Sequence, residues 1–445
     1  MNLLSRLLLG KGNGRLSKDQ FILFLLLVTA MVGPGLSYGA FYLFYFVLIF
    51  YLGFQVLNKR ELFIQDLKEI ATKPSNLFLI ISPVYFATWI LFSGPDVHAI
   101  KHLFFICIGF SLSILIIKNA KSFESITFVI RCLTFVYCID LLIGLLEAAQ
   151  LFRWPISKIS TINDWFGRSN LLGEILATTS SESYVYSMPT GFHWNPNNFA
   201  TVAIIGLPFF IFNKRYIVSL IGILSIVILT VAAGAKLSFI AAIFIAIVSL
   251  VFVKRHWRQV ATLIIVLCFF LTGGFNLSIF KPSLKVKEIK SLVFEVESES
   301  EKKLNESSVS YRMLLIDEGI NMFKDNPILG VGGGGSEQIL KQKGGIGKYN
   351  ITNLHNYWLE LLVEGGILYF LFFLVWVLSH LKKILAGLSL LDKDSKSWYF
   401  TVSILVGVFG FFVSSISTSS LYGFLPFYIL IGLVSAISLN LKKES

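Results

Sequence analysis

The chain has 445 residues, of which 55% are hydrophobic and only 14% are charged, and its mean hydropathy is +0.74. Because a soluble protein of this length carries nearly twice that charged fraction, the composition excludes an ordinary soluble domain. The formal net charge is +12, but Lys and Arg occur in short clusters between apolar runs, which is typical of membrane-protein loops and not of a nucleic-acid-binding surface. These features predict an all-α, polytopic transmembrane helical bundle.

Apolar runs of membrane-spanning length recur along the chain and predict about twelve spans. The expected spans are 21–33, 37–57, 77–93, 103–117, 125–147, 197–213, 216–233, 236–253, 259–278, 357–381, 398–416 and 422–440. The expected regions are spans one to five in 1–147, a first large external loop in 148–196, spans six to nine in 197–272, a large helical external loop in 273–356, and spans ten to twelve in 357–445.

Basic residues follow every even-numbered predicted span, as at Lys59-Arg60, Lys214-Arg215 and Lys382-Lys383. Since Lys and Arg concentrate in cytoplasmic loops, both termini are expected in the cytoplasm and the two large loops outside. All four cysteines lie within apolar runs and show no metal-ligand spacing, so we expect neither disulfides nor a metal site.

The fifth predicted span contains Asp140, an ionisable group whose partner the sequence does not identify. The next polar feature is the run from Gly191 to Asn198. Its Asn195-Pro196 pair predicts a helix start, with asparagine as the N-cap and proline in the first turn. That explanation leaves His193, Asn197 and Asn198, which also crowd the outer interface and are therefore candidate substrate-binding residues.

Lys236 lies in a very tight predicted outer turn between spans seven and eight. Two interpretations stay open with equal weight. The side chain either reaches to the bilayer surface with no further role, or it supplies a cation beneath a lipid-linked phosphate.

The second large loop contains an amphipathic helix over residues 311–323, which Asn326-Pro327 is expected to end. Arg312 opens this helix. Its guanidinium suits a phosphate contact, and the alternative is a surface arginine paired with Asp317 or a nearby glutamate. The glycine run that follows, including Gly332 and Gly333, is interpreted either as a phosphate-binding nest or as a hinge. No Gly-Lys-Ser/Thr follows it, so it is not a nucleotide loop.

His355 precedes predicted span ten, where a helix N-terminus disfavours an imidazolium. A neutral histidine there suits a general base acting on a hydroxyl, and the alternative is a histidine that caps the helix. Asn356 and Glu360 follow it, and Glu364 comes one helical turn later. Carboxylates at the edge of hydrocarbon are costly and are usually functional or paired. Gly365-Gly366 predict a kink below them.

Three motifs together resemble the O-antigen polymerase and ligase superfamily of bacterial envelope glycosyltransferases. They are Gly-Phe-His-Trp-Asn-Pro-Asn-Asn at 191–198, Ala-Lys-Leu-Ser at 235–238, and Pro-Ile-Leu-Gly-Val-Gly at 327–332 followed by His-Asn-Tyr-Trp-Leu-Glu at 355–360. The resemblance covers about residues 185 to 375, and the chain is also similar to polymerases of the teichuronic-acid type. Met188 and Lys236 stand where relatives commonly have arginine, which puts two expected anion contacts in doubt.

The resemblance implies a metal-independent glycosyltransferase without a cofactor, in the bacterial cytoplasmic (inner) membrane. It would transfer an undecaprenyl-pyrophosphate-linked oligosaccharide to a hydroxyl of an acceptor glycan on the outer face. Arg312 and Lys236 would neutralise the pyrophosphate, and His355 would deprotonate the attacking hydroxyl. Membrane lipids, a flippase and a chain-length regulator are the further expected partners, and no nucleic acid is expected.

Two alternatives remain at this point. A ligase would use the same donor but pass the polymer to a lipid or glycan acceptor. A transporter or lipid-linked-oligosaccharide flippase would also fit about twelve spans with both ends inside. However, facilitator-type carriers usually have a long cytoplasmic link after span six, and here that link is only Asn213-Lys214-Arg215. The first predicted outer loop, residues 33–38, has no carboxylate, which argues against metal-dependent membrane glycosyltransferases.

Overall fold

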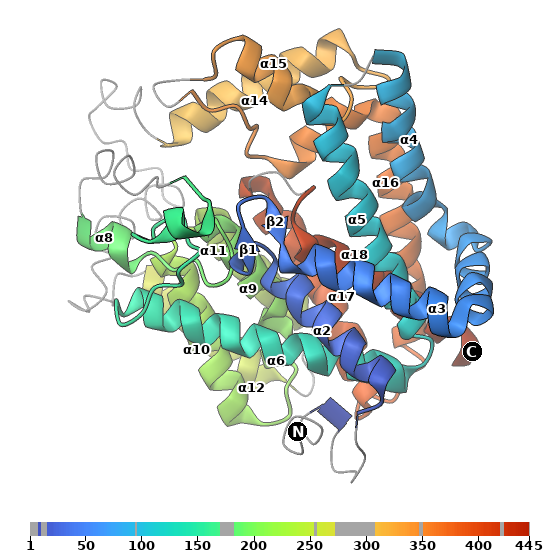
Figure 1. Cartoon of the computed structure of the whole chain (residues 1–445). Coiled ribbons are helices and arrows are strands. Elements are labelled where there is room, and N and C mark those ends of the chain that lie inside the picture. Colours follow the sequence, from blue (N-terminus) through green and yellow to red (C-terminus); the bar gives the residue numbers. More distant parts are fainter. Residues whose placement is uncertain are drawn as a thin grey trace. The chain divides into compact units, whose positions relative to one another are not determined.

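The structure is a computed structural model that describes residues 8–9, 16–93, 96–169, 182–252, 256–271, 308–346, 350–418 and 422–444. Figure 1 shows the helices in chain order. They are α2 (Lys18–Val32), α3 (Leu43–Ala71), α4 (Leu77–Ser93), α5 (Val97–Asn119), α6 (Phe123–Ala148), α8 (Glu182–Ser187), α9 (Pro196–Ile211), α10 (Tyr216–Ala232), α11 (Lys236–Leu250), α12 (Trp257–Leu271), α14 (Ser308–Asp325), α15 (Gly335–Gln342), α16 (Tyr357–Leu388), α17 (Lys396–Ser414) and α18 (Leu425–Glu444).

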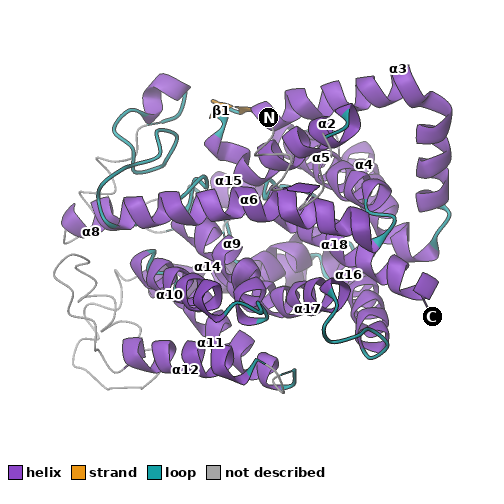
Figure 2. Ribbon diagram, turned by 90° about the horizontal axis from the view of Figure 1, so that it is seen from below, coloured by secondary structure: helices purple, strands orange, loops and turns teal. Residues whose placement is uncertain are grey.

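Helix dominates the fold, as Figure 2 shows, and the strands of the described residues form one antiparallel hairpin, β1 (Ser37–Tyr38) with β2 (Phe41–Tyr42). Among the described residues, six helical segments are long and apolar enough to cross a membrane: Lys18–Gly35, Pro74–Phe92, Val97–Asn119, Phe123–Ala148, Tyr357–Leu388 and Lys396–Ser417. Five shorter apolar helices are Pro196–Ile211, Tyr216–Ala232, Lys236–Leu250, Trp257–Leu271 and Leu425–Leu441. The predicted all-α multi-pass membrane fold is confirmed.

Predicted span two differs most from the structure. The expected range 37–57 begins inside the β hairpin, because its residues are as apolar as the helix that follows. Helix α3 starts at Leu43 and runs on to Ala71, with a non-helical kink at Lys59, whose ammonium pairs with Asp19. The end of predicted span nine, 272–278, and most of the first half of the large predicted loop lie outside the described residues.

The helix starts follow from short polar capping residues. Ser17 and Ser122 form capping boxes at the starts of α2 and α6, with Gln20 and Ser125 as the respective third residues. Asn195 caps α9 and Pro196 is its first residue, as predicted from the sequence. These caps satisfy backbone N–H groups that a helix start otherwise leaves unpaired.

The chain forms two compact units, each made of separate stretches of sequence. Unit 1 comprises 1–66, 119–294 and 390–414, and unit 2 comprises 67–118, 295–389 and 415–445. In unit 1, α9 packs against α10, α11 and α17. In unit 2, α16 packs against α4, α14, α15 and α18. The candidate residues therefore fall into two sets, which are described separately.

Candidate functional site

Helix α16 is broken near its start, and the segment 326–336, called here the signature segment, fills the break. Gly366 has φ 65° and ψ −179°, so the predicted kink is confirmed. Val331 N donates to Val363 O at 2.9 Å, and Ile367 N donates to Pro327 O at 2.9 Å. The signature segment thus pairs with backbone groups that the interrupted helix cannot satisfy itself, as buried backbone requires.

The break needs glycine on both sides. A Cβ added at Gly330 would lie 2.5 Å from both Glu364 O and Gly366 N. Gly330 and Gly366 also have positive φ values of 74° and 65°, which only glycine adopts at little cost. The Pro-Ile-Leu-Gly-Val-Gly and Glu-Gly-Gly motifs are therefore two halves of one substructure.

Two aromatic side chains of α4 hold the signature segment. Tyr85 Oη lies 2.8 Å from both Leu329 O and Gly365 O, so its hydroxyl can donate to either carbonyl. Trp89 Nε1 donates to Leu329 O at 3.1 Å. The segment is consequently fixed from α4 as well as from α16.

The structure gives Gly332 and Gly333 a packing role. Both are buried. A Cβ on Gly332 would lie 3.0 Å from the Trp89 ring, and one on Gly333 would overlap His102 Nδ1. Gly332 N donates to Glu364 O at 3.0 Å, so this N–H is not directed at a ligand. These contacts favour close packing over the predicted phosphate nest.

Glu364 is buried and anchors the start of α15. Its Oε1 accepts from Ser336 Oγ at 2.5 Å, and its Oε2 accepts from Gly334 N at 3.1 Å. The same Oε2 lies 3.2 Å from His102 Nδ1. Sequence reasoning identified Glu364 as functional or paired but missed His102. The available signal was a histidine directly before predicted span four.

Arg312 and His355 both belong to the region where α14 packs on the start of α16. A buried cluster joins the two helices through Leu315, Met322, Leu340, Leu354, Leu359 and Val363. Gly319 allows the close approach, since a Cβ there would lie 2.6 Å from Leu359 Cδ2. Arg312 is seven residues before Gly319, two helical turns along the same face. That face contacts Leu354, which directly precedes His355, and Leu359 in the first turn of α16.

The guanidinium of Arg312 has no acidic partner within the described ranges, in contrast to the alternative of a pair with Asp317. The nearby Glu318 instead pairs with Lys343 of the α15 region at 2.6 Å. Burial lowers the pKa of Arg312 from its ordinary value. Because a guanidinium is strongly basic, the side chain keeps its charge at neutral pH. A partly buried, charged guanidinium is suited to an anionic ligand.

His355 has an unusual backbone conformation, with φ 49°. Positive φ in a non-glycine residue is uncommon and costs free energy, so the surrounding contacts must impose it. One such contact is the hydrogen bond from His355 N to Asn353 Oδ1 at 2.8 Å. The imidazole is half-buried. It is held just before the N-terminus of α16, as predicted.

Asn356 is the N-cap of α16, and its Oδ1 accepts from Leu359 N at 3.2 Å. Its side-chain oxygen is thus used structurally, which leaves the amide Nδ2 as the group for a substrate contact. Glu360, one turn further on, is only 4% exposed. These two residues and His355 lie within the first turn and cap of one helix.

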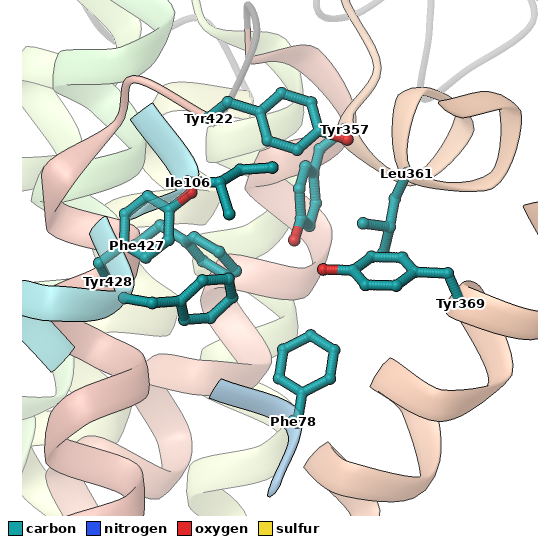
Figure 3. Close-up of a pocket in the computed structure, with 9 residues that line it drawn as sticks. Phe78, Ile106, Tyr357, Leu361, Tyr369, Tyr422, Phe427 and Tyr428 are labelled. Atoms are coloured by element: carbon teal, nitrogen blue, oxygen red, sulfur yellow. The ribbon is translucent and has the colours of Figure 1, made fainter. Parts of the chain in front are cut away.

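An aromatic pocket lies beneath this helix start (Figure 3). It is lined by Phe78, Ile106, Phe110, Tyr357, Leu361, Tyr369, Tyr422, Phe427 and Tyr428. Figure 3 shows the hydroxyls of Tyr357 and Tyr369 directed toward one another across it. Its volume of about 10 Å³ holds one water molecule at most. The aromatic side chains around the pocket pack closely together, and the pocket is too small for a sugar or lipid.

In unit 1, Asp140 of α6 holds the turn before α9. Its Oδ1 accepts from Phe192 N at 2.8 Å, and its Oδ2 lies 3.2 Å from His193 Nε2. This contact identifies the partner that the sequence left open. His193 is only 2% exposed. Its ring therefore helps to hold the turn through Asp140. This burial does not favour the predicted direct contact with substrate.

Glu147 holds the same turn two helical turns further along α6. Its Oε2 accepts from Thr190 N at 2.6 Å and from Gly191 N at 2.8 Å. Arg153 Nη1 lies 3.3 Å from Glu147 Oε1 and balances its charge. Arg153 also donates to Met188 O at 2.8 Å. Sequence reasoning missed both residues, although a glutamate at the end of an apolar span was a visible signal.

The other unit 1 candidates share one region. Asn197 and Asn198 form the first turn of α9, and Lys236 is the first residue of α11. Ala200 packs with Ala233 and Ala235, which places these two helix starts beside each other. The structure thus groups Asn197, Asn198 and Lys236 within unit 1.

Residues 218–374 match a family model described as O-antigen ligase. No curated protein matches the chain. The matched range contains Lys236, the signature segment, Arg312 and His355, and it confirms the resemblance inferred from the motifs. It supports a ligase-type or polymerase-type function in general over the transporter alternative.

Proposed function

We propose that the chain is an envelope polysaccharide polymerase. It transfers an undecaprenyl-pyrophosphate-linked glycan to a sugar hydroxyl of an acceptor glycan. The match to the O-antigen ligase model supports the O-antigen polymerase and ligase superfamily. One observation carries the proposal. The α14 face that bears Arg312 packs on Leu354, which directly precedes His355, and on Leu359, and Arg312 has no carboxylate partner in the described part of the chain.

The proposed reaction is a direct displacement at the anomeric carbon. The acceptor oxygen forms the new bond as the bond from that carbon to the pyrophosphate oxygen breaks. His355 takes the proton of the attacking hydroxyl as general base. Arg312 stabilises the negative charge that develops on the departing pyrophosphate, so no metal is required. Displacement from the opposite face inverts the anomeric configuration.

Unit 1 holds its own group of proposed donor-binding residues. Lys236 offers a cation beside the start of α9, and Asn197 and Asn198 offer amide groups for a pyrophosphate or the first sugar. Asn198 Oδ1 is buried and receives no hydrogen bond from the residues described. His193 would keep this helix start in place through Asp140.

The proposed location is the outer face of the bacterial cytoplasmic membrane, with both termini cytoplasmic. The support is the basic clusters after even-numbered spans, which put the α14–α15 region outside. There a polyprenyl pyrophosphate is available as the anion and ATP is not. A flippase that delivers the donor and a chain-length regulator are the proposed partners.

The test is a chromosomal deletion complemented by wild type, His355→Ala or Lys341→Gln. Lys341 is an exposed cation of α15 without an assigned role, so its variant is the matched control. Wild type and control should restore full-length glycan, and His355→Ala should leave single repeat units at equal protein level. Full-length glycan from the His355→Ala strain would refute the proposal.

A ligase is the second candidate, because the matching family is described as O-antigen ligase. The same deletion separates the two. Single repeat units attached to the acceptor indicate a lost polymerase, whereas free lipid-linked polymer indicates a lost ligase.

A further inference from the structure

A second arginine, Arg168, lies in unit 1 near the start of α9, and the neighbouring residues fix its position. The loop that carries it rests on the β1–β2 hairpin. Gly39 N donates to Phe166 O at 2.7 Å, and a Cβ on Gly167 would lie 3.3 Å from Gly39 N. This close contact fixes the backbone directly before Arg168.

The guanidinium itself is fixed by three side chains. Arg168 Nη2 donates to Ser37 Oγ at 2.8 Å. Its central carbon lies 5.7 Å from the Tyr42 ring centre and 5.1 Å from that of Trp194. Cation–π contacts hold the plane of the group, and among the described residues Ser37 Oγ is the acceptor that its N–H donors reach.

No carboxylate of the described residues pairs with Arg168, and its buried Nε finds no hydrogen-bond acceptor there. Arg153 of the same unit makes the contrast. Its charge is met by Glu147, and its other donors reach the carbonyls of Met188 and Tyr186. Arg153 is therefore a structural cation, whereas Arg168 meets no carboxylate among the residues that the structure describes.

The nearby N-terminus of α9 also favours an anion at this place. Trp194, which contacts the guanidinium, directly precedes Asn195, the N-cap of α9. A helix N-terminus carries partial positive charge, so a cation beside it is repelled unless an anion is present. A planar guanidinium offers paired N–H groups that match the two oxygens of a phosphate or carboxylate.

We propose that Arg168 binds an oxyanion of the lipid-linked glycan donor, either its pyrophosphate or a sugar carboxylate. The inference rests on the proposed function and adds a binding residue to the group formed by Asn197, Asn198 and Lys236. Trp194 and Tyr42 orient the guanidinium, and the hairpin supports it from below.

The experiment uses the purified full chain in detergent as wild type, Arg168→Gln, Arg168→Lys and the control Lys341→Gln. KM and kcat are measured with two lipid-linked donors, one with a neutral glycan and one whose glycan carries a uronic acid. The shift in Tm on adding undecaprenyl pyrophosphate alone is measured in parallel.

Arg168→Gln should raise the donor KM about tenfold or more, since a charge-assisted contact is lost. The donor KM of Arg168→Lys should fall between those of wild type and Arg168→Gln, because lysine keeps the charge but loses the planar pair of donors. A rise with both donors, together with a lost ligand-induced Tm shift, identifies the pyrophosphate. A rise confined to the uronic-acid donor, with the shift retained, identifies the carboxylate.

The proposal is overturned if the donor KM of Arg168→Gln stays at the control value with both donors. It is also overturned if the variant lowers only kcat and the ligand-free Tm, because that result indicates a structural residue. A wild-type protein that turns over neither donor would contradict the proposed function instead. The Tm shift with undecaprenyl pyrophosphate would then still report whether Arg168 contributes to anion binding.

Discussion

Replacing Gly330 by alanine should disrupt the break in α16 and abolish function. The new Cβ would lie 2.5 Å from Glu364 O and Gly366 N, both backbone atoms that cannot rotate away. Alanine at φ 74° costs about 1–2 kcal/mol from backbone strain alone. Relieving the overlap would also separate Val331 N from Val363 O and Gly332 N from Glu364 O. Two buried hydrogen bonds add about 2 kcal/mol.

Gly344→Ala is the matched control. Gly344 has a similar φ of 84°, but a Cβ there meets nothing within 4 Å. The control should therefore lose only the strain contribution, and Gly330→Ala should be less stable than it by about 2 kcal/mol or more. The assay is Tm in detergent together with complementation of a deletion strain. Equal Tm and equal glycan from the two variants would refute this account of the signature segment.

Further predictions concern charge. Arg312→Lys should keep part of the activity, since it retains the charge but loses the bidentate donors, and a donor KM raised about tenfold would show this; an unchanged KM would contradict an anion contact at Arg312. Asp140→Asn should lower Tm, because removing one partner of a buried pair costs about 3 kcal/mol or more, with Lys341→Gln as the stable reference; equal Tm values would contradict the anchoring role. Activity of the purified enzyme should survive EDTA, and a loss that Mg²⁺ restores would argue against the metal-independent mechanism.

The sequence predicted the helices well because membrane burial forces long apolar runs with short polar ends. Asn195-Pro196 begins α9 and Gly366 breaks α16, as expected. Both depend on local backbone chemistry, which is visible in a few neighbouring residues. The start of α3 was wrong, since the hairpin before it is equally apolar.

The site was only partly predictable. Asp140 with His193, and His102 with Glu364, are contacts between distant parts of the chain, and no local pattern gives their pairing. An ionisable residue within an apolar span indicates that a partner exists but does not indicate which residue the partner is. The packing of Gly332 and Gly333 against α4 and α5 was missed for the same reason. Arg168 was missed because its significance comes from the two rings around it.

The central claim is that His355 is the general base of glycan transfer. The most direct measurement is the single-turnover rate of purified wild type and His355→Ala with a defined lipid-linked donor and acceptor, at matched Tm. Loss of a positioned base predicts a rate that falls by about 100-fold or more, with donor binding retained. A His355→Ala rate within a few-fold of wild type would contradict the account.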